Sequence, residues 1–280
     1  MYTKFYNFSE KPFNMTPDSK FFYPSSKHLE ALDNMRYAID ERKGFVVITG
    51  EIGAGKTTVC RTLINKLSIN TKVAIITNTH LNQKELVTEI LDELEVEYQG
   101  GSKQKLLSGL NKYLIQQLSD NVNVVLIIDE AQNLTPKVLE EVRMLSNLET
   151  EKEKLIQIIL LGQPQLKKKL QHPNLEQLRQ RVVLHYHINS LNRQEAEEYI
   201  RHRLRLVNPQ QQDLFTSTAI DAIYDCSRGI PRLINLVCDG ALLSGYLYEL
   251  KQINEQIIHE VTKEKEFNYK PLDLQIPDSI

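Results

Sequence analysis

This sequence has little net charge, few cysteines and no long apolar runs. Its 280 residues carry a formal net charge of −2, which gives no sign of a protein that binds nucleic acid through overall positive charge. A net charge this close to zero is still compatible with a local basic patch. The three cysteines, Cys60, Cys226 and Cys238, show no paired or metal-type spacing. This usage is typical of a protein in a reducing cytosol.

No stretch of the sequence predicts a membrane span or a signal peptide. The longest apolar runs, such as 124–128 and 155–161, have the length of strands, whereas a spanning helix needs about 20 residues. The N-terminus, MYTKFYNFSEKPF, lacks the apolar core of a signal peptide. We therefore expect a cytoplasmic protein, unless a partner holds it at a membrane. With 41% apolar and 25% charged residues, the chain has the composition of a soluble globular protein.

The most informative stretch is VVITGEIGAGKTTVC, from Val46 to Cys60. Its residues 50–57 match the phosphate-loop (Walker A) pattern GxxxxGK[ST], between a predicted strand at 45–49 and a predicted helix at 56–67. In that setting, backbone N–H groups and the helix N-terminus surround a polyphosphate. The candidate nucleotide-binding residues are Gly50, Glu51, Ile52, Gly53, Ala54, Gly55, Lys56, Thr57 and Thr58.

Within this loop, different residues are expected to do different work. Gly53 and Gly55 supply unusual backbone angles and leave room for the phosphates. Lys56 reaches the outer phosphates, and the Thr57 hydroxyl binds Mg²⁺. The predicted cofactors are ATP and Mg²⁺.

A second motif, VVLIIDEAQ, follows some seventy residues later and resembles a Walker B sequence. Its apolar run brings Asp129 to the carboxyl end of a strand, where α/β sheets place their ligands. There Asp129 can hold Mg²⁺, and Glu130 can polarise a water molecule against the γ-phosphate. The plainer alternative is that two acidic residues simply open a helix.

Two polar residues follow other predicted strands and are candidates for the same edge of the sheet. Gln163 is a candidate sensor of the γ-phosphate or of its attacking water, although GQP is also good turn chemistry. Asn78 is a candidate to hydrogen-bond Glu130 and hold it inactive until a partner binds. The alternative for Asn78 is a helix-capping or turn role.

Three arginines complete the candidate catalytic set. Arg179 and Arg181 precede the last predicted strand, where one of them can act as an arginine finger in the site of a neighbouring subunit. The alternative is a solvated charge pair. In SRGIPR, Arg232 begins a helix near Pro231, and Gly229 permits a tight entry. Arg232 can thus fold onto the γ-phosphate when a lid closes.

Alternating strand and helix patterns predict an α/β fold with an open, doubly wound parallel sheet. The expected strands are 45–49, 72–77, 123–129, 155–162 and 182–188, and the expected helices among them are 26–40, 82–95, 103–118 and 136–148. After about residue 190 only helical patterns follow, at 193–206, 216–226, 231–250 and 254–264. We therefore expect a nucleotide-binding domain at 1–189 with an N-terminal extension at 1–25, a helical lid at 190–264 and a flexible tail at 265–280.

Taken in order, the phosphate loop, acidic strand end, polar sensor, pre-strand arginine and GxPR helix resemble an AAA+ ATPase, a P-loop NTPase. More narrowly, FYNFSEKPFNMTPDSKFFYPSSKHLEAL, GEIGAGKTT, LIIDEAQ, LLGQPQL and SRGIPRLIN resemble the ATPase domain of the general secretion pathway protein A (ExeA-like) family. The resemblance covers about residues 1–265. Its N-terminal segment is far more specific than the phosphate loop.

This resemblance implies ATP hydrolysis and assembly into a homo-oligomer, as a ring or a nucleotide-dependent assembly. It also implies Arg181 as the better finger candidate and Arg232 as the lid sensor. For the stretches 12–13 and 23–28 it leaves two options, a place near the nucleotide base or packing against the core. Longer family members continue into a membrane span and a periplasmic peptidoglycan-binding region, whereas this sequence stops at Ile280. We therefore expect an ATPase module that acts on a protein of a secretion, pilus or polysaccharide-export system.

Two other functions are compatible with the motifs. Transposition regulators of the TniB and TnsC type share the same core and assemble on DNA. Basic residues for such a role stand at 167–169 and at Arg201, Arg203 and Arg205, although the net charge favours solvated helix faces for both groups. The third option is a nucleotide-gated binding module that cycles too slowly to be an enzyme. Glu130, usable as a catalytic base, argues against it.

Overall fold

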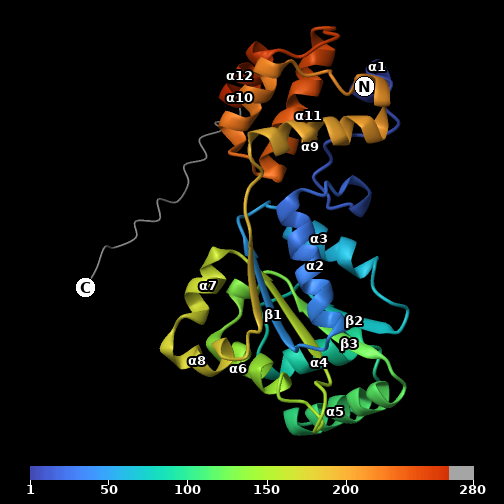
Figure 1. Ribbon diagram of the computed structural model, residues 1–280, viewed down its shortest axis with the longest axis vertical. Helices are drawn as coiled ribbons and strands as arrows, with labels where there is room; N and C mark the ends of the chain where they lie inside the picture. Colours follow the sequence, from blue (N-terminus) through green and yellow to red (C-terminus); the bar gives the residue numbers. More distant parts are fainter. Residues whose placement is uncertain (265–280) are drawn as a thin grey trace, which may run out of the picture. The chain divides into compact units, whose positions relative to one another are not determined.

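Five parallel strands form the centre of residues 18–189 in the computed structural model, which describes residues 1–264 (Figure 1). Their order across the sheet is β2–β3–β4–β1–β5, so β1 lies inside the sheet between β4 and β5. The strands are β1 (Phe45–Gly50), β2 (Thr71–Ile76), β3 (Asn123–Ile128), β4 (Gln157–Gly162) and β5 (Leu184–Ile188). The predicted five-stranded parallel sheet is confirmed.

Helices cover both faces of this sheet because the strands are apolar on both sides. In β1, Val46 and Ile48 pack with α2 (Ser26–Asp40) and α3 (Lys56–Ile64), whereas Phe45 and Val47 pack into the opposite core. The two-residue period of a strand produces this division. The helices that contribute to the opposite core are α4 (Gln83–Glu93), α5 (Lys103–Ser119), α6 (Pro136–Leu145), α7 (Pro164–Leu170) and α8 (Glu176–Arg179).

The strand register brings the candidate site residues to one edge. Thr49 of β1 is paired with Gly162 of β4, and Ile128 of β3 is paired with Leu160 of β4. The loop after β1, the acidic pair after β3 and Gln163 after β4 therefore leave the sheet side by side. In a parallel α/β sheet this carboxyl edge is where ligands bind.

The short helices α7 and α8 were not predicted. Pro164 occupies the first turn of α7, where its missing N–H costs nothing, so the GQP sequence opens a helix rather than a simple turn. Short 3₁₀ helices also occur in both parts of the chain, at Ser19–Phe21, Ala131–Asn133, Pro173–Leu175 and Pro209–Gln211.

The second unit is helical and is built from both parts of the chain that flank the α/β unit, residues 1–17 and the described residues 190–264. Its helices are α1 (Tyr2–Phe5), α9 (Arg193–Val207), α10 (Ser217–Ser227), α11 (Pro231–Leu247) and α12 (Glu255–Glu264). The four predicted lid helices are present, and α11 ends three residues earlier than predicted.

The N-terminal extension differs from its predicted place in the α/β domain, because its first 17 residues pack in the helical unit. The buried Arg203 donates a hydrogen bond from Nη1 to the Pro12 carbonyl, at 2.8 Å. Phe13 is buried with its ring edge-on to Phe215. These long-range contacts are invisible in the sequence. Of the two options for the stretch 12–13, packing into a core is the one observed.

No helix within residues 1–264 combines the length and apolar character that crossing a membrane requires. The predicted tail at 265–280 lies outside the described residues.

Candidate nucleotide-binding site

The loop between β1 and α3 has the backbone of a phosphate-binding loop. Gly53 and Gly55 adopt φ angles of +80° and +95°, which confirms the predicted need for glycine at both positions. Gly55 is the N-cap residue of α3, and no side chain caps the first-turn N–H groups of that helix. These groups and the helix dipole make the loop a natural site for an anion. Gly50 serves packing instead, because a Cβ there would lie 2.9 Å from the Ile188 carbonyl oxygen.

Lys56 is a buried cation at the mouth of this loop. Its Nζ donates hydrogen bonds to the carbonyl oxygens of Gly50 (2.9 Å) and Glu51 (3.0 Å). Burial lowers the pKa of Lys56, while the nearby carboxylates of Glu130 and Asp129 act in the opposite direction. The Lys56 side chain lies within the loop, where the outer phosphates of a nucleotide would bind. Among the other loop residues, Ile52 is exposed and Thr58 is half-buried.

Thr57 and Asp129 supply the kind of oxygen atoms that Mg²⁺ prefers. The Thr57 hydroxyl donates a 2.8 Å hydrogen bond to Oδ2 of the buried Asp129, so the two predicted ligands already converge. The other carboxylate oxygen, Oδ1, accepts from the backbone N–H of Glu130 at 2.8 Å. Within residues 1–264 no cluster of three metal-binding side chains occurs. Mg²⁺ is commonly held by one or two protein oxygens together with phosphate and water, and Thr57 and Asp129 could supply such oxygens.

Glu130 is held by two side-chain amides. Its backbone lies in the left-handed region (φ +50°), and its Oε2 accepts a hydrogen bond from Nε2 of Gln163 at 3.1 Å. Nε2 of Gln132 donates to the same oxygen. The side chain of Gln163 does not cap α7, and its amide instead contacts Glu130 in the candidate site. The predicted base and the predicted sensor are therefore in direct contact.

Asn78 does not make the contact predicted for it. It is exposed, and its Oδ1 accepts a 3.2 Å hydrogen bond from the backbone N–H of His80, a local turn. Within residues 1–264 no hydrogen bond joins Asn78 to Glu130. The amides that restrain Glu130 come from Gln163 and Gln132. Gln132 was overlooked, although it stands in the same motif three residues after Asp129.

Arg179 and Arg181 precede β5 and lie at the amino edge of the sheet, opposite the phosphate loop. Arg179 ends α8 and is exposed, whereas Arg181 is half-buried. The Lys154 ammonium, and after it the Arg181 guanidinium, lower the pKa of Glu149, which places Arg181 beside the loop before β4. Arg232 is the second residue of α11 in the helical unit and is exposed, with Pro231 at the first position as predicted.

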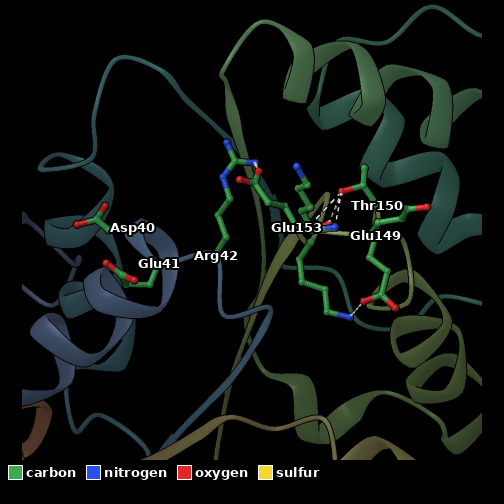
Figure 2. Close-up of a pocket in the computed structure, with 9 residues that line it drawn as sticks. Asp40, Glu41, Arg42, Glu149, Thr150 and Glu153 are labelled. Carbon is green, nitrogen blue, oxygen red and sulfur yellow. Dashed lines mark hydrogen bonds and ion pairs between the residues drawn. The ribbon is translucent and has the colours of Figure 1, made fainter.

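A hollow at the amino ends of β1 and β4 is separate from the nucleotide-binding edge. It is lined by residues 40–42 and 149–154. Figure 2 shows Arg42 and Glu153 pointing toward one another, with a 3.4 Å ion pair between them. Lys154 pairs with Glu149 in the same hollow. The hollow contains none of the predicted site residues.

A buried histidine fixes the rear of the phosphate loop. Nε2 of His28 lies 2.9 Å from the Ala54 carbonyl oxygen, and since that oxygen can only accept, Nε2 carries the proton. Nδ1 then accepts from the Ser25 hydroxyl at 2.6 Å. The Ala54–Gly55 peptide is planar, so fixing its carbonyl on the His28 side directs the Gly55 N–H the other way. Sequence reasoning placed 23–28 near the base or against the core, and did not single out this histidine.

Comparison with known proteins gives one family match and one close relative in sequence. Residues 39–170 match the model of the AAA domain. The chain is 42% identical over 247 residues to general secretion pathway protein A of Aeromonas hydrophila. That alignment covers 88% of this chain and 45% of the relative, so the chain spans about half the length of the protein it matches.

Solved structures support the fold at low sequence identity. The Aeropyrum pernix ORC2 protein, in its ADPNP–ADP complexes, has a TM-score of 0.69 at 14% identity, covering 92% of this chain and 72% of that one. Cdc6p of Pyrobaculum aerophilum has a TM-score of 0.67 at 17% identity, with 88% and 71% covered. The Thermotoga maritima RuvB Holliday junction branch migration motor has a TM-score of 0.57 at 17% identity, with 84% and 68% covered.

Replacing His28 should weaken nucleotide binding. His28→Leu leaves the Ala54 carbonyl without its donor, and a lost hydrogen bond of about 1 kcal/mol corresponds to roughly fivefold weaker binding of ADP. His28→Gln restores an N–H donor and should bind ADP nearly as tightly as the unmodified protein. Titration calorimetry measures both affinities, and thermal denaturation without nucleotide checks that both variants fold. Equal affinity for ADP in all three proteins would contradict this role.

Proposed function

This chain is an AAA+ P-loop domain related to general secretion pathway protein A, and from that premise we propose that it binds ATP with Mg²⁺ and hydrolyses it to ADP and phosphate. The observation that carries the proposal is the convergence of Lys56, Thr57, Asp129, Glu130 and Gln163 at one edge of the sheet. Phosphoryl transfer needs positioning and charge neutralisation more than covalent chemistry from the protein, and these five side chains supply both.

Each of these residues has a distinct task in hydrolysis. Backbone N–H groups of the loop and the Lys56 ammonium bind the phosphates and stabilise the charge that develops on them. Thr57 and Asp129 hold Mg²⁺, which neutralises phosphate charge when bound. Glu130 accepts a proton from the attacking water as general base. Gln163 lies in contact with Glu130 and is placed to orient either that water or the γ-phosphate.

We infer that the complete site forms between subunits of a homo-oligomer, in a ring or a nucleotide-dependent assembly. Arg181 and Arg179 cannot serve the loop of their own subunit, because β5 separates them from it by five residues, or roughly 16 Å. An arginine on the opposite edge is instead available to a neighbour. Arg181 is the better candidate because the relationship to general secretion pathway protein A favours it. Arg232 would act as the lid sensor.

The wider role follows from the sequence relationship. A 42% identity to general secretion pathway protein A supports a task in energising or regulating assembly of a secretion, pilus or polysaccharide-export system, through a protein partner at the inner membrane. Because the chain matches less than half of that relative, this role applies to the shared ATPase part.

A transposition-regulator function that requires DNA is less well supported by the side chains. Arg203 is buried and bonded to the Pro12 carbonyl, and Arg201 pairs with Glu197 and Asp213. Lys169 donates to the carbonyls of Gln132 and Leu134. Much of the positive charge noted in the sequence is thus committed to internal contacts. Lys167, Lys168 and Arg205 stay exposed.

Glu130→Gln should retain ATP binding and lose turnover. Removal of a general base typically costs 10²- to 10⁴-fold, so steady-state phosphate release should fall by at least about 100-fold while the affinity for ATP is kept. Gln165, exposed on the same edge, provides a matched control, and Gln165→Ala should be fully active. Turnover that survives Glu130→Gln would sink the assignment of the base. Undetectable turnover in the unmodified protein would favour a nucleotide-gated binding module.

Two inactive variants should complement each other if the site is shared. Arg181→Ala retains an intact loop, and Lys56→Ala retains an intact Arg181, so mixed assemblies contain some complete interfaces. A 1:1 mixture should recover part of the phosphate release. Mixing either variant with the double variant Lys56→Ala/Arg181→Ala cannot create a complete interface and is the control. Absence of recovery in the first mixture, with assembly verified by light scattering, would argue against a finger in trans.

Duplex DNA should leave phosphate release unchanged. Binding through phosphate contacts would be strongest at low salt and would weaken steeply as salt is added. The measurement is turnover with and without a long duplex at low ionic strength, together with DNA binding by fluorescence anisotropy. DNA-stimulated hydrolysis with a steep salt dependence would replace the secretion-type role with the transposition-type one.

A further inference from the structure

Gln132 lies between the proposed base and the proposed sensor and contacts both. It belongs to the 3₁₀ helix Ala131–Asn133 that follows Glu130. Its Nε2 donates to Oε2 of Glu130, and its Oε1 accepts a 3.0 Å hydrogen bond from the backbone N–H of Gln163. The Gln132 carboxamide therefore donates to Glu130, which follows β3, and accepts from Gln163, which follows β4.

The backbone of Gln132 is held in place from α7. Nζ of Lys169 donates to the carbonyl oxygens of Gln132 and Leu134, the latter at 2.8 Å. These two carbonyls lie at the end of the 3₁₀ turn, where they would otherwise lack partners. Burial lowers the pKa of Lys169, in agreement with an ammonium enclosed by this turn.

The chain also leaves room for this amide. A Cβ added at Gly162 would lie 3.0 Å from Oε1 of Gln132 and 2.7 Å from Cδ2 of Leu166. Gly162 does not have a positive φ, so its backbone conformation does not require glycine. Glycine is needed there because a side chain would clash with its neighbours. Any larger residue there would displace the carboxamide of Gln132 or the side chain of Leu166.

The geometry leaves one oxygen of the base available. Both amide donors bind Oε2 of Glu130, and within residues 1–264 no hydrogen bond reaches Oε1. When the Gln163 side chain turns toward a phosphate or water, Gln132 can still hold Oε2 and the Gln163 backbone. A carboxylate fixed by one oxygen can direct the other at a water molecule, and small errors in such placement are costly.

We propose that Gln132 is the positioning residue of the hydrolytic site, which orients the Glu130 carboxylate and fixes its distance from Gln163. This role rests on the proposed ATPase activity. In this role Gln132 exchanges no proton and acts through its contacts with Glu130 and Gln163. Its removal should therefore slow the chemical step and leave substrate binding intact.

Gln132→Ala tests the role through a split between kcat and KM. We expect kcat for ATP to fall roughly 10- to 100-fold, with KM, the affinity for ADP and the melting temperature unchanged. Gln165→Ala is the matched control and should leave kcat unchanged. An unaltered kcat in Gln132→Ala would overturn the proposal. If Glu130→Gln abolishes turnover in parallel, the proposed function survives that failure. If Glu130→Gln is active, the assignment of the base fails, and only undetectable turnover in the unmodified protein would contradict the proposed ATP hydrolysis.

A histidine at this position gives a readout that a purely structural role would not produce. A neutral imidazole donates from one nitrogen and accepts at the other, so Gln132→His can rebuild the bridge in part. Below its pKa of about 6.5 the imidazolium only donates, and the bond from the Gln163 N–H is lost. The activity of Gln132→His should exceed that of Gln132→Ala at pH 8 and fall toward it at pH 5.5, relative to the unmodified protein. Equal activity of both variants at pH 8 would count against the bridge.

Discussion

The parallel register of β3, β4 and β1 is the constraint on which the site depends. Because the three strands are in step, the loop after β1, the acidic pair after β3 and Gln163 after β4 emerge at one edge. Apolar residues on both faces hold that register, since a slip of one residue would exchange the faces of a strand. Two long-range polar contacts of the site follow from this alignment. Thr57 meets Asp129, and Gln163 meets Glu130, without any long loop to carry them.

The sequence predicts the sheet, the loop and the helical C-terminal part because each has a local signal. Continuous apolar runs mark buried strands, and glycine at 53 and 55 marks a backbone with positive φ. Pairings across the edge have no such signal. Asn78, Gln132 and Gln163 are all amides close to strand ends, and only the folded chain shows that Gln132 and Gln163 reach Glu130 while Asn78 closes a turn. The contact of His28 has no sequence signal either, because its partner is a backbone carbonyl 26 residues away.

The site combines rigid and adjustable parts. His28 and Gly55 fix the phosphate loop, and Lys169 fixes the turn that carries Gln132. The side chains of Lys56 and Gln163, by contrast, make hydrogen bonds that a phosphate group could replace. Such a division suits a nucleotide switch, because binding can alter a few side-chain contacts without disturbing the core.

The split construction of the helical unit bears on how the protein is made. Residues 1–17 are synthesised before the α/β unit, yet their partners, among them Arg203 and Phe215, are synthesised after it. The α/β unit between them can fold as soon as β5 has emerged, since domains form as units during synthesis. Helix α1 must wait until its partners in the helical unit have been synthesised. A nascent chain would thus complete its α/β unit before its helical unit.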